Sequence, residues 1–199
     1  MNKLTKAAID LLRDLIATPS FSQEEEKTAD RIGQWFDQHS IPYKRVGNNI
    51  WGQNKAFDHK KPTLLLNSHH DTVQPNSAYT IDPFEPKIED GKLFGLGSND
   101  AGGALVSLIA LFTHFYALKN PKYNLILAAT AEEEIAGNHS LRGLLSELPK
   151  IDLAIVGEPT EMHLAIAEKG LLVFDAIISG TPGHAAHSNN DNPIMKLPM

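Results

Sequence analysis

The side chains best suited to chemistry lie in four short polar clusters, at residues 67–71, 98–100, 132–134 and 157–159. Three of these clusters directly follow an apolar run, and the other precedes a predicted helix. The chain has no cysteine, so a metal ion would have to be bound by His, Asp and Glu. One histidine with several carboxylates suits a divalent ion such as zinc, cobalt or manganese. The residue types therefore indicate metal-dependent chemistry.

Each cluster taken alone also has a plain structural interpretation. The run from His69 to Asp71 can be a solvated loop, and Asp100 can cap a helix. The glutamates at residues 132–134 can be a solvated helix start, and Glu158 can end a strand. Ligands of open α/β sheets bind at the carboxyl ends of strands, so clusters at successive strand ends make coincidence a poor explanation. Asp71 also has the spacing needed to orient the ring of His69.

Hydrophobic periodicity predicts the elements that position these clusters. Apolar residues at helical spacing predict a helix over residues 4–17 and a second one that opens with a capping box at Ser22 and Glu25 and ends near residue 39. The predicted strands are 43–46, 50–51, 63–67, 124–129 and 151–156, and the later helices are 104–118 and 140–147. From the Leu64 strand onward this is a β-α-β-α-β order. It predicts an α/β fold with a mostly parallel sheet and helices on both faces.

The composition and pattern of the sequence change after Glu168. Residues 171–179 are rich in β-branched and aromatic side chains, which predicts a strand, and residues 192–197 have the pattern of a helix start. We therefore expect a metal-binding domain over residues 1–168 and the beginning of a second domain over residues 169–199.

The overall composition excludes several classes of function. The chain of 199 residues is 42% hydrophobic and 21% charged, which is typical of a folded globular protein. Its 24 acidic and 18 basic residues give a net charge of −6, so we expect neither a nucleic acid nor a membrane surface as partner. The absence of cysteine excludes disulfides and thiol nucleophiles. No stretch is apolar and long enough for a signal peptide or a membrane span, so the cytoplasm is the default location.

Five motifs in order resemble those of the M20 family of metallopeptidases and deacylases. Residues 68–73 are similar to its His-x-Asp motif, and residues 82–100 to the stretch that ends in its bridging aspartate. Residues 130–134 are similar to its paired-glutamate motif, residues 156–160 to its next ligand motif, and residues 180–185 to its lid segment. The resemblance covers essentially the whole chain. It implies a zinc-exopeptidase-like catalytic domain followed by the start of an α+β lid and dimerisation domain.

The resemblance also implies two divalent metal ions, zinc or cobalt. Their ligands in this chain would be His69, Asp100, Glu134 and Glu158. His69 and Glu158 would hold one ion, Glu134 would help to hold the other, and Asp100 would bridge the two.

Three further residues receive catalytic roles from the resemblance. Asp71 would hydrogen-bond His69 and set its tautomer. Glu133 would be the general base, taking a proton from the attacking water and returning it to the leaving amine. His184 would stabilise the tetrahedral oxyanion, and in this family it is often supplied by the neighbouring subunit of a dimer.

Several positions depart from the family pattern. The usual Asp-Glu-Glu is Glu-Glu-Glu at residues 132–134, and residues 100–104 lack the lysine of the usual Asp-Met-Lys-Gly-Gly. His70 and His187 fall at variable positions, and we expect both at the surface. Family members also return from the lid to the catalytic domain, where a C-terminal histidine completes the second metal site. We therefore expect this chain to be roughly half of the enzyme, ending inside the lid and inactive on its own.

Within the family, residues 97–103 and 128–134 resemble those of acetylornithine deacetylases. This favours a homodimeric enzyme that removes the acyl group from an N-acyl amino acid, N-acetylornithine in particular, as in arginine biosynthesis. A succinyl-diaminopimelate desuccinylase, a dipeptidase or a carboxypeptidase would share every ligand and differ in the side-chain pocket. A non-catalytic binding module is a further alternative, against which the intact Glu133 argues.

Overall fold

The polypeptide forms two compact units, Met1–Met162 and His163–Met199. Their structure is a computed structural model, and it describes residues 2–167, 169–170, 172, 174–184, 186–187 and 191–197. The functional division proposed near Lys169 stays a prediction.

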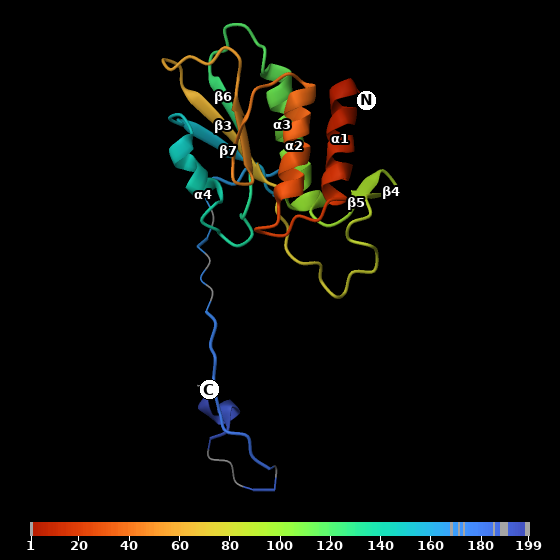
Figure 1. Cartoon of the computed structure of the whole chain (residues 1–199), viewed down its shortest axis with the longest axis vertical. Coiled ribbons are helices and arrows are strands. Elements are labelled where there is room, and N and C mark those ends of the chain that lie inside the picture. Colours follow the sequence, from red (N-terminus) through yellow and green to blue (C-terminus); the bar gives the residue numbers. More distant parts are fainter. Residues whose placement is uncertain are drawn as a thin grey trace. The chain divides into compact units, whose positions relative to one another are not determined.

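A five-stranded mixed sheet forms the centre of the first unit (Figure 1). In spatial order its strands are β1 (Lys44–Val46), β2 (Asn49–Gln53), β6 (Asn124–Thr130), β3 (Thr63–His69) and β7 (Leu153–Val156). β3 runs parallel to both β6 and β7, whereas β2 is antiparallel to β6 and β1 is antiparallel to β2. Four of the five strands therefore point the same way and only β2 opposes them, which confirms the predicted mostly parallel sheet.

Helices cover both faces of this sheet. The long helices α1 (Lys3–Ile16), α2 (Glu26–Gln38) and α3 (Gly103–Phe115) pack on one face, and the short α4 (Leu141–Leu144) lies on the other (Figure 1). A short 3-10 turn, Leu145–Glu147, extends α4. Within the described residues, none of the helices combines the length and apolarity that crossing a bilayer requires.

Two separate cores explain why the central strands are unbroken apolar runs in the sequence. Successive residues of a strand point to opposite faces. Leu66 and Leu127 accordingly lie in the core formed with α1, α2 and α3. Leu65 and Ile126 lie in the second core, together with Leu144 of α4. Because both faces are buried, the middle of each of these strands is apolar on both faces.

The start of α2 differs from the predicted capping box. The Ser22 hydroxyl donates to Asp71 Oδ2 at 2.8 Å instead of capping the helix. Glu25, the residue at the N-cap, makes no side-chain hydrogen bond to the helix. Its Oε1 accepts the backbone N–H of Glu132 at 3.1 Å. Both side chains therefore serve segments that are distant in the sequence, and α2 begins only at Glu26.

A hairpin and a turn before α3 were not predicted. β4 (Lys87–Glu89) and β5 (Lys92–Phe94) form an antiparallel hairpin. Asp90 and Gly91, with φ of 50° and 73°, form its turn, and an Asp-Gly pair is the local signal for such a hairpin. A five-residue turn, Ser98–Gly102, then leads into α3, and its residues Asp100 and Ala101 have non-helical backbone angles.

The second unit has little regular structure among its described residues. A 3-10 turn at Pro193–Lys196 is its regular element. The predicted strand over residues 171–179 is wrong for the described part of that range, which has no strand. Leu172, Phe174 and Ile177 are all exposed there. A strand requires a partner for its backbone N–H and C=O groups, and none of the described segments supplies one.

Candidate metal centre

The candidate site lies at the carboxyl ends of three neighbouring parallel strands. His69, the last residue of β3, pairs with Thr130 at the end of β6. Asn67 pairs with Val156 at the end of β7. Because the three strands are parallel and β7 ends only two residues before β3 and β6, the segments that follow them meet at one edge of the sheet.

The residues predicted as metal ligands gather at this edge. His69, Asp100 and Glu134 each offer one ligand atom, and these three atoms lie within 4.8 Å of one another. His69 Nε2 is 3.1 Å from Asp100 Oδ1 and 3.8 Å from Glu158 Oε2. One imidazole with three carboxylates is a donor set that suits zinc and other divalent ions of similar hardness. The chemistry of the site thus fits the metal, and the individual ligand roles stay predictions.

A tight turn brings Asp100 to the end of β3. The turn Ser98–Gly102 is closed by a hydrogen bond from the N–H of Gly102 to the carbonyl of Gly97, at 2.9 Å. Gly97 has a φ of 73°, and a Cβ there would lie 2.7 Å from Thr72 Cγ2. Glycine is required at this position both by the backbone conformation and by the close approach to Thr72.

Asp71 is fully buried and holds both His69 and the loop after β6. Its Oδ1 lies 3.3 Å from His69 Nδ1 and accepts the N–H of Glu133 at 3.1 Å. Its Oδ2 accepts the N–H of Glu134 at 3.1 Å and the hydroxyl of Ser22 at 2.8 Å. Burial acts to raise the pKa of Asp71, but these hydrogen bonds outweigh it and lower the pKa. His69 Nδ1 is thereby turned toward Asp71, and Nε2 faces the other carboxylates.

The crowding of carboxylates shifts the pKa values of the site. Burial acts to lower the pKa of His69, but the hydrogen bond to Asp71 and the negative charges of Asp71, Glu158 and Glu133 raise it to about 9. Burial and the neighbouring carboxylates raise the pKa of Glu158 to about 7, against the effect of His69. Burial and the same crowding raise the pKa of Glu134. In the absence of a cation, protons on these side chains offset the negative charge of the carboxylates. A bound divalent cation would offset the same charge.

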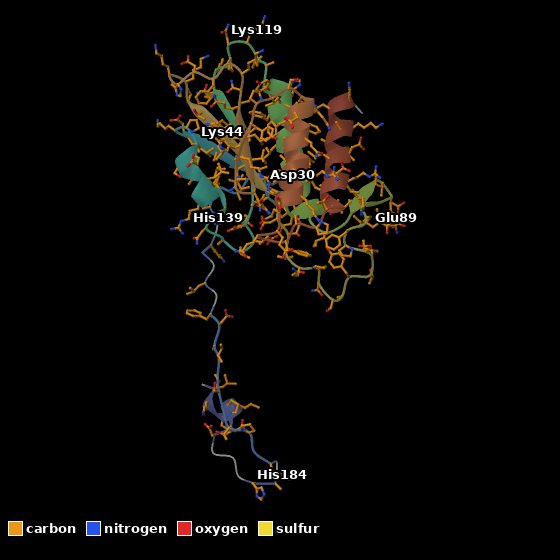
Figure 2. The ribbon with its side chains drawn as sticks, in the orientation of Figure 1. Asp30, Lys44, Glu89, Lys119, His139 and His184 are labelled. Atoms are coloured by element: carbon orange, nitrogen blue, oxygen red, sulfur yellow. The ribbon has the colours of Figure 1, made fainter. Side chains whose placement is uncertain are left out.

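The three consecutive glutamates have three different environments. Glu134 belongs to the candidate metal group. Glu133 lies beside it, with its Oε2 3.8 Å from His69 Nε2 and its side chain 52% exposed. Glu132 is buried, with a φ of 54°, and its Oε2 accepts the N–H of His139 at 3.1 Å, a residue marked in Figure 2. The interpretation of this run as a solvated helix start is wrong, since the run is a loop anchored in the protein.

His70 is buried, which contradicts its expected surface position. Its Nδ1 lies 2.8 Å from the Thr28 hydroxyl, and its Nε2 lies 3.0 Å from the carbonyl of Asn48. Burial lowers its pKa to about 4, so the ring is neutral at physiological pH. Because a carbonyl only accepts, Nε2 carries the proton, and Nδ1 then accepts the single hydroxyl proton of Thr28, whose oxygen also lies 2.9 Å from the carbonyl of Glu25. Adjacent residues at the end of β3 point to opposite sides, and both sides of this sheet are covered.

His184 lies in the second unit and is exposed (Figure 2). Its Nδ1 accepts the N–H of Ala186 at 3.1 Å. The ring of His187, which is exposed as expected, lies 5.7 Å from it. With Nδ1 acting as an acceptor, the neutral ring carries its proton on Nε2.

The fold agrees with comparisons to known proteins. The family described as Peptidase family M20/M25/M40 matches residues 65–196, and the chain belongs to this family. A succinyl-diaminopimelate desuccinylase from Rhodospirillum centenum is 29% identical over 211 residues, covering 95% of this chain and 54% of that protein. The chain spans about half the length of the curated relatives it matches.

Two solved structures show the same fold. An M20 family metallo-carboxypeptidase from Sulfolobus solfataricus matches with a TM-score of 0.62 and 22% identity, over 79% of this chain and 37% of that one. A dinuclear metal-binding peptidase of the M20 family from Bacillus subtilis matches with a TM-score of 0.59 and 19% identity, over 77% of this chain and 42% of that one.

These findings confirm the family and correct the finer assignment. The curated relatives are named succinyl-diaminopimelate desuccinylase, so they support the alternative substrate and not N-acetylornithine. The predicted link to arginine biosynthesis receives no support from them.

Proposed function

We propose that this protein is a metal-dependent amide hydrolase that removes a succinyl group from an N-succinyl amino acid. The observation that carries the proposal is the group of His69, Asp100 and Glu134 at the sheet edge, with Glu133 beside it as a carboxylate outside the group. Family membership supports the reaction class, and the names of the curated relatives support the succinyl group. We further propose that the substrate is a small molecule and that the active form is a homodimer.

We assign the metal-binding and acid–base roles to different residues. His69, Asp100, Glu134 and Glu158 would hold two divalent ions, zinc or cobalt, which when bound would polarise the scissile carbonyl and acidify the attacking water. Glu133 would accept a proton from that water as the new C–O bond forms. It would then deliver the proton to the nitrogen as the C–N bond breaks, which yields succinate and a free amine.

Glu133 suits this role because of its position. A base must change its protonation state during the reaction, which a carboxylate committed to a metal cannot easily do. Glu133 is half exposed, and its backbone N–H is held by Asp71 while its side chain is free to reach a substrate. We also propose that His184 donates its Nε2–H to the oxyanion, since the contact with Ala186 places the proton on that nitrogen.

The test is a parallel hydrolysis screen. The complete reading frame that encodes this chain is expressed, stripped with a chelator and reloaded with zinc or cobalt. N-succinyl-diaminopimelate, N-acetylornithine and a set of dipeptides are then compared by kcat/KM. We expect the succinyl substrate to have the highest value. A highest value for N-acetylornithine would restore the deacetylase interpretation, and no hydrolysis by the metal-loaded protein would contradict the proposed function.

A further inference from the structure

The loop that follows β6 is held by side chains from three distant segments. Its four consecutive N–H groups, at residues 131–134, all donate to side-chain oxygens. Asn49 Oδ1 accepts the first at 3.0 Å, and Glu25 Oε1 accepts the second at 3.1 Å. Asp71 accepts the third and fourth, both at 3.1 Å. The left-handed conformation of Glu132 turns these successive N–H groups inward, so that they bind carboxylates as an anion-binding concavity does.

Glu25 is the least expected member of this arrangement. It is fully buried, and its contacts are with N–H donors: the backbone of Gln23 at 2.7 Å, the backbone of Glu132, and Asn48 Nδ2 at 2.9 Å. A buried carboxylate balanced by amides alone is costly compared with an apolar residue. The capping of α2 does not require this side chain, because it makes no cap hydrogen bond.

A closed polar network fixes Glu25 in place. Asn48 donates to Glu25 through its side chain and accepts from His70 through its carbonyl. His70 in turn accepts from Thr28, which lies one turn beyond Glu25 on α2. The network joins the start of α2, the turn between β1 and β2, and the end of β3 directly beside His69. Buried networks with satisfied partners are rigid, so the position of Oε1 is well defined.

We propose that Glu25 is a positioning residue that holds the loop carrying the general base and one metal ligand. This inference rests on the proposed function for the roles of Glu133 and Glu134. Asp71 anchors the loop from the β3 side, and Glu25 anchors it from the α2 side, one residue before the base. With both anchors in place, the backbone at Glu133 has little freedom and its half-exposed side chain starts from a fixed point. Without Glu25, the N–H of Glu132 loses its acceptor, and the side chains that still hold the neighbouring N–H groups are those of Asn49 and Asp71.

A graded set of variants tests this. In Glu25→Gln the amide oxygen can keep Oε1's place, because Asn48 can turn its own oxygen toward the new NH2 group, but a neutral acceptor is weaker than a carboxylate. Glu25→Ala removes every acceptor. Glu24→Gln is the matched control, since Glu24 is the exposed neighbour. The readouts are amide hydrogen exchange at residues 131–134, metal stoichiometry, thermal stability, and kcat and KM per metal-loaded site.

We expect exchange in the loop to accelerate in the order Glu24→Gln, Glu25→Gln, Glu25→Ala, by on the order of tenfold or more in the last. The kcat should fall by up to about 10²-fold with KM little changed, because the base is misplaced while substrate contacts remain. Unchanged exchange at residues 131–134 in both Glu25 variants would overturn the proposal. So would a loss of stability with kcat per loaded site unchanged. If Glu25→Ala fails to fold, the exchange rates and kcat of Glu25→Gln still test the proposal. The exchange measurement needs no substrate, so it stands apart from a failure of the proposed hydrolase activity.

Discussion

The substitution Asp71→Asn isolates the dual role of the buried carboxylate at the end of β3. It replaces one oxygen with an NH2 group of nearly the same size and leaves the volume unchanged. Asp71 Oδ1 faces His69 Nδ1 and the N–H of Glu133, and Oδ2 faces the N–H of Glu134 and the hydroxyl of Ser22. Whichever oxygen is replaced, the new NH2 group is a hydrogen-bond donor that faces other donors.

The structure selects between the two orientations of the amide. If NH2 takes the place of Oδ2, the Ser22 hydroxyl can rotate and become the acceptor, which leaves the Glu134 N–H alone without a partner. A buried donor without a partner costs about 1–3 kcal/mol of unfolding free energy. For a chain of this size that lowers Tm by about 2–12 °C. His69 also loses a charged partner, and removal of such an orienting contact typically weakens metal binding about 10–100-fold.

Thermal denaturation of the metal-free protein and titration with zinc or cobalt measure these two effects separately. Asp37→Asn is the matched control, because Asp37 is exposed on α2. Wild-type Tm and wild-type metal affinity in Asp71→Asn would refute the reasoning. Weakened metal binding with an unchanged Tm would show that Asp71 orients His69 but does not anchor the loop.

Three further predictions concern the base, the core and pH. Glu133→Gln should retain bound metal and lose most turnover, whereas Glu134→Gln should lower metal occupancy; equal metal loss would mean that the two roles are wrongly assigned. Phe36→Ala, at a fully buried ring, should lower the unfolding free energy in urea by about 3–5 kcal/mol, and Phe115→Ala, at a ring 38% exposed, by clearly less. The pKa of metal-free His69 is raised to about 9, so a proton must leave before metal binds below that pH. Metal affinity should therefore weaken as pH falls, approaching about tenfold per unit, and a pH-independent affinity would contradict this.

The central strands β3 and β6 were predictable because burial on both faces makes each of them a nearly continuous apolar run. The edge strand β7 is also an apolar run, although its residues are exposed. The apolar runs that became β3, β6 and β7 have a helical segment between each pair, and that order leads to parallel strands. The pattern was silent on the β4–β5 hairpin, whose strands are only three residues long and exposed. It was misleading for the described residues of the range 171–179, because strand propensity has no effect without a partner strand.

The sequence by itself determined which chemistry this protein can hold. The order of the motifs, the absence of cysteine, the positions of His69, Glu134 and Glu158 after apolar runs and that of Asp100 before a predicted helix were enough to predict a divalent metal site at a sheet edge. Backbone periodicity carries that information because it is local: it places residues on strands, and parallel strands end together.

Only the tertiary structure decided what supports the site. Ser22 and Glu25 have the spacing of a capping box, yet they bond to Asp71 and Glu132, which are 49 and 107 residues away in the chain. His70 is indistinguishable in type from His69 but is buried, neutral and bound to Thr28. Such contacts depend on which segments pack together, because a buried polar atom takes whatever partner lies within hydrogen-bonding distance.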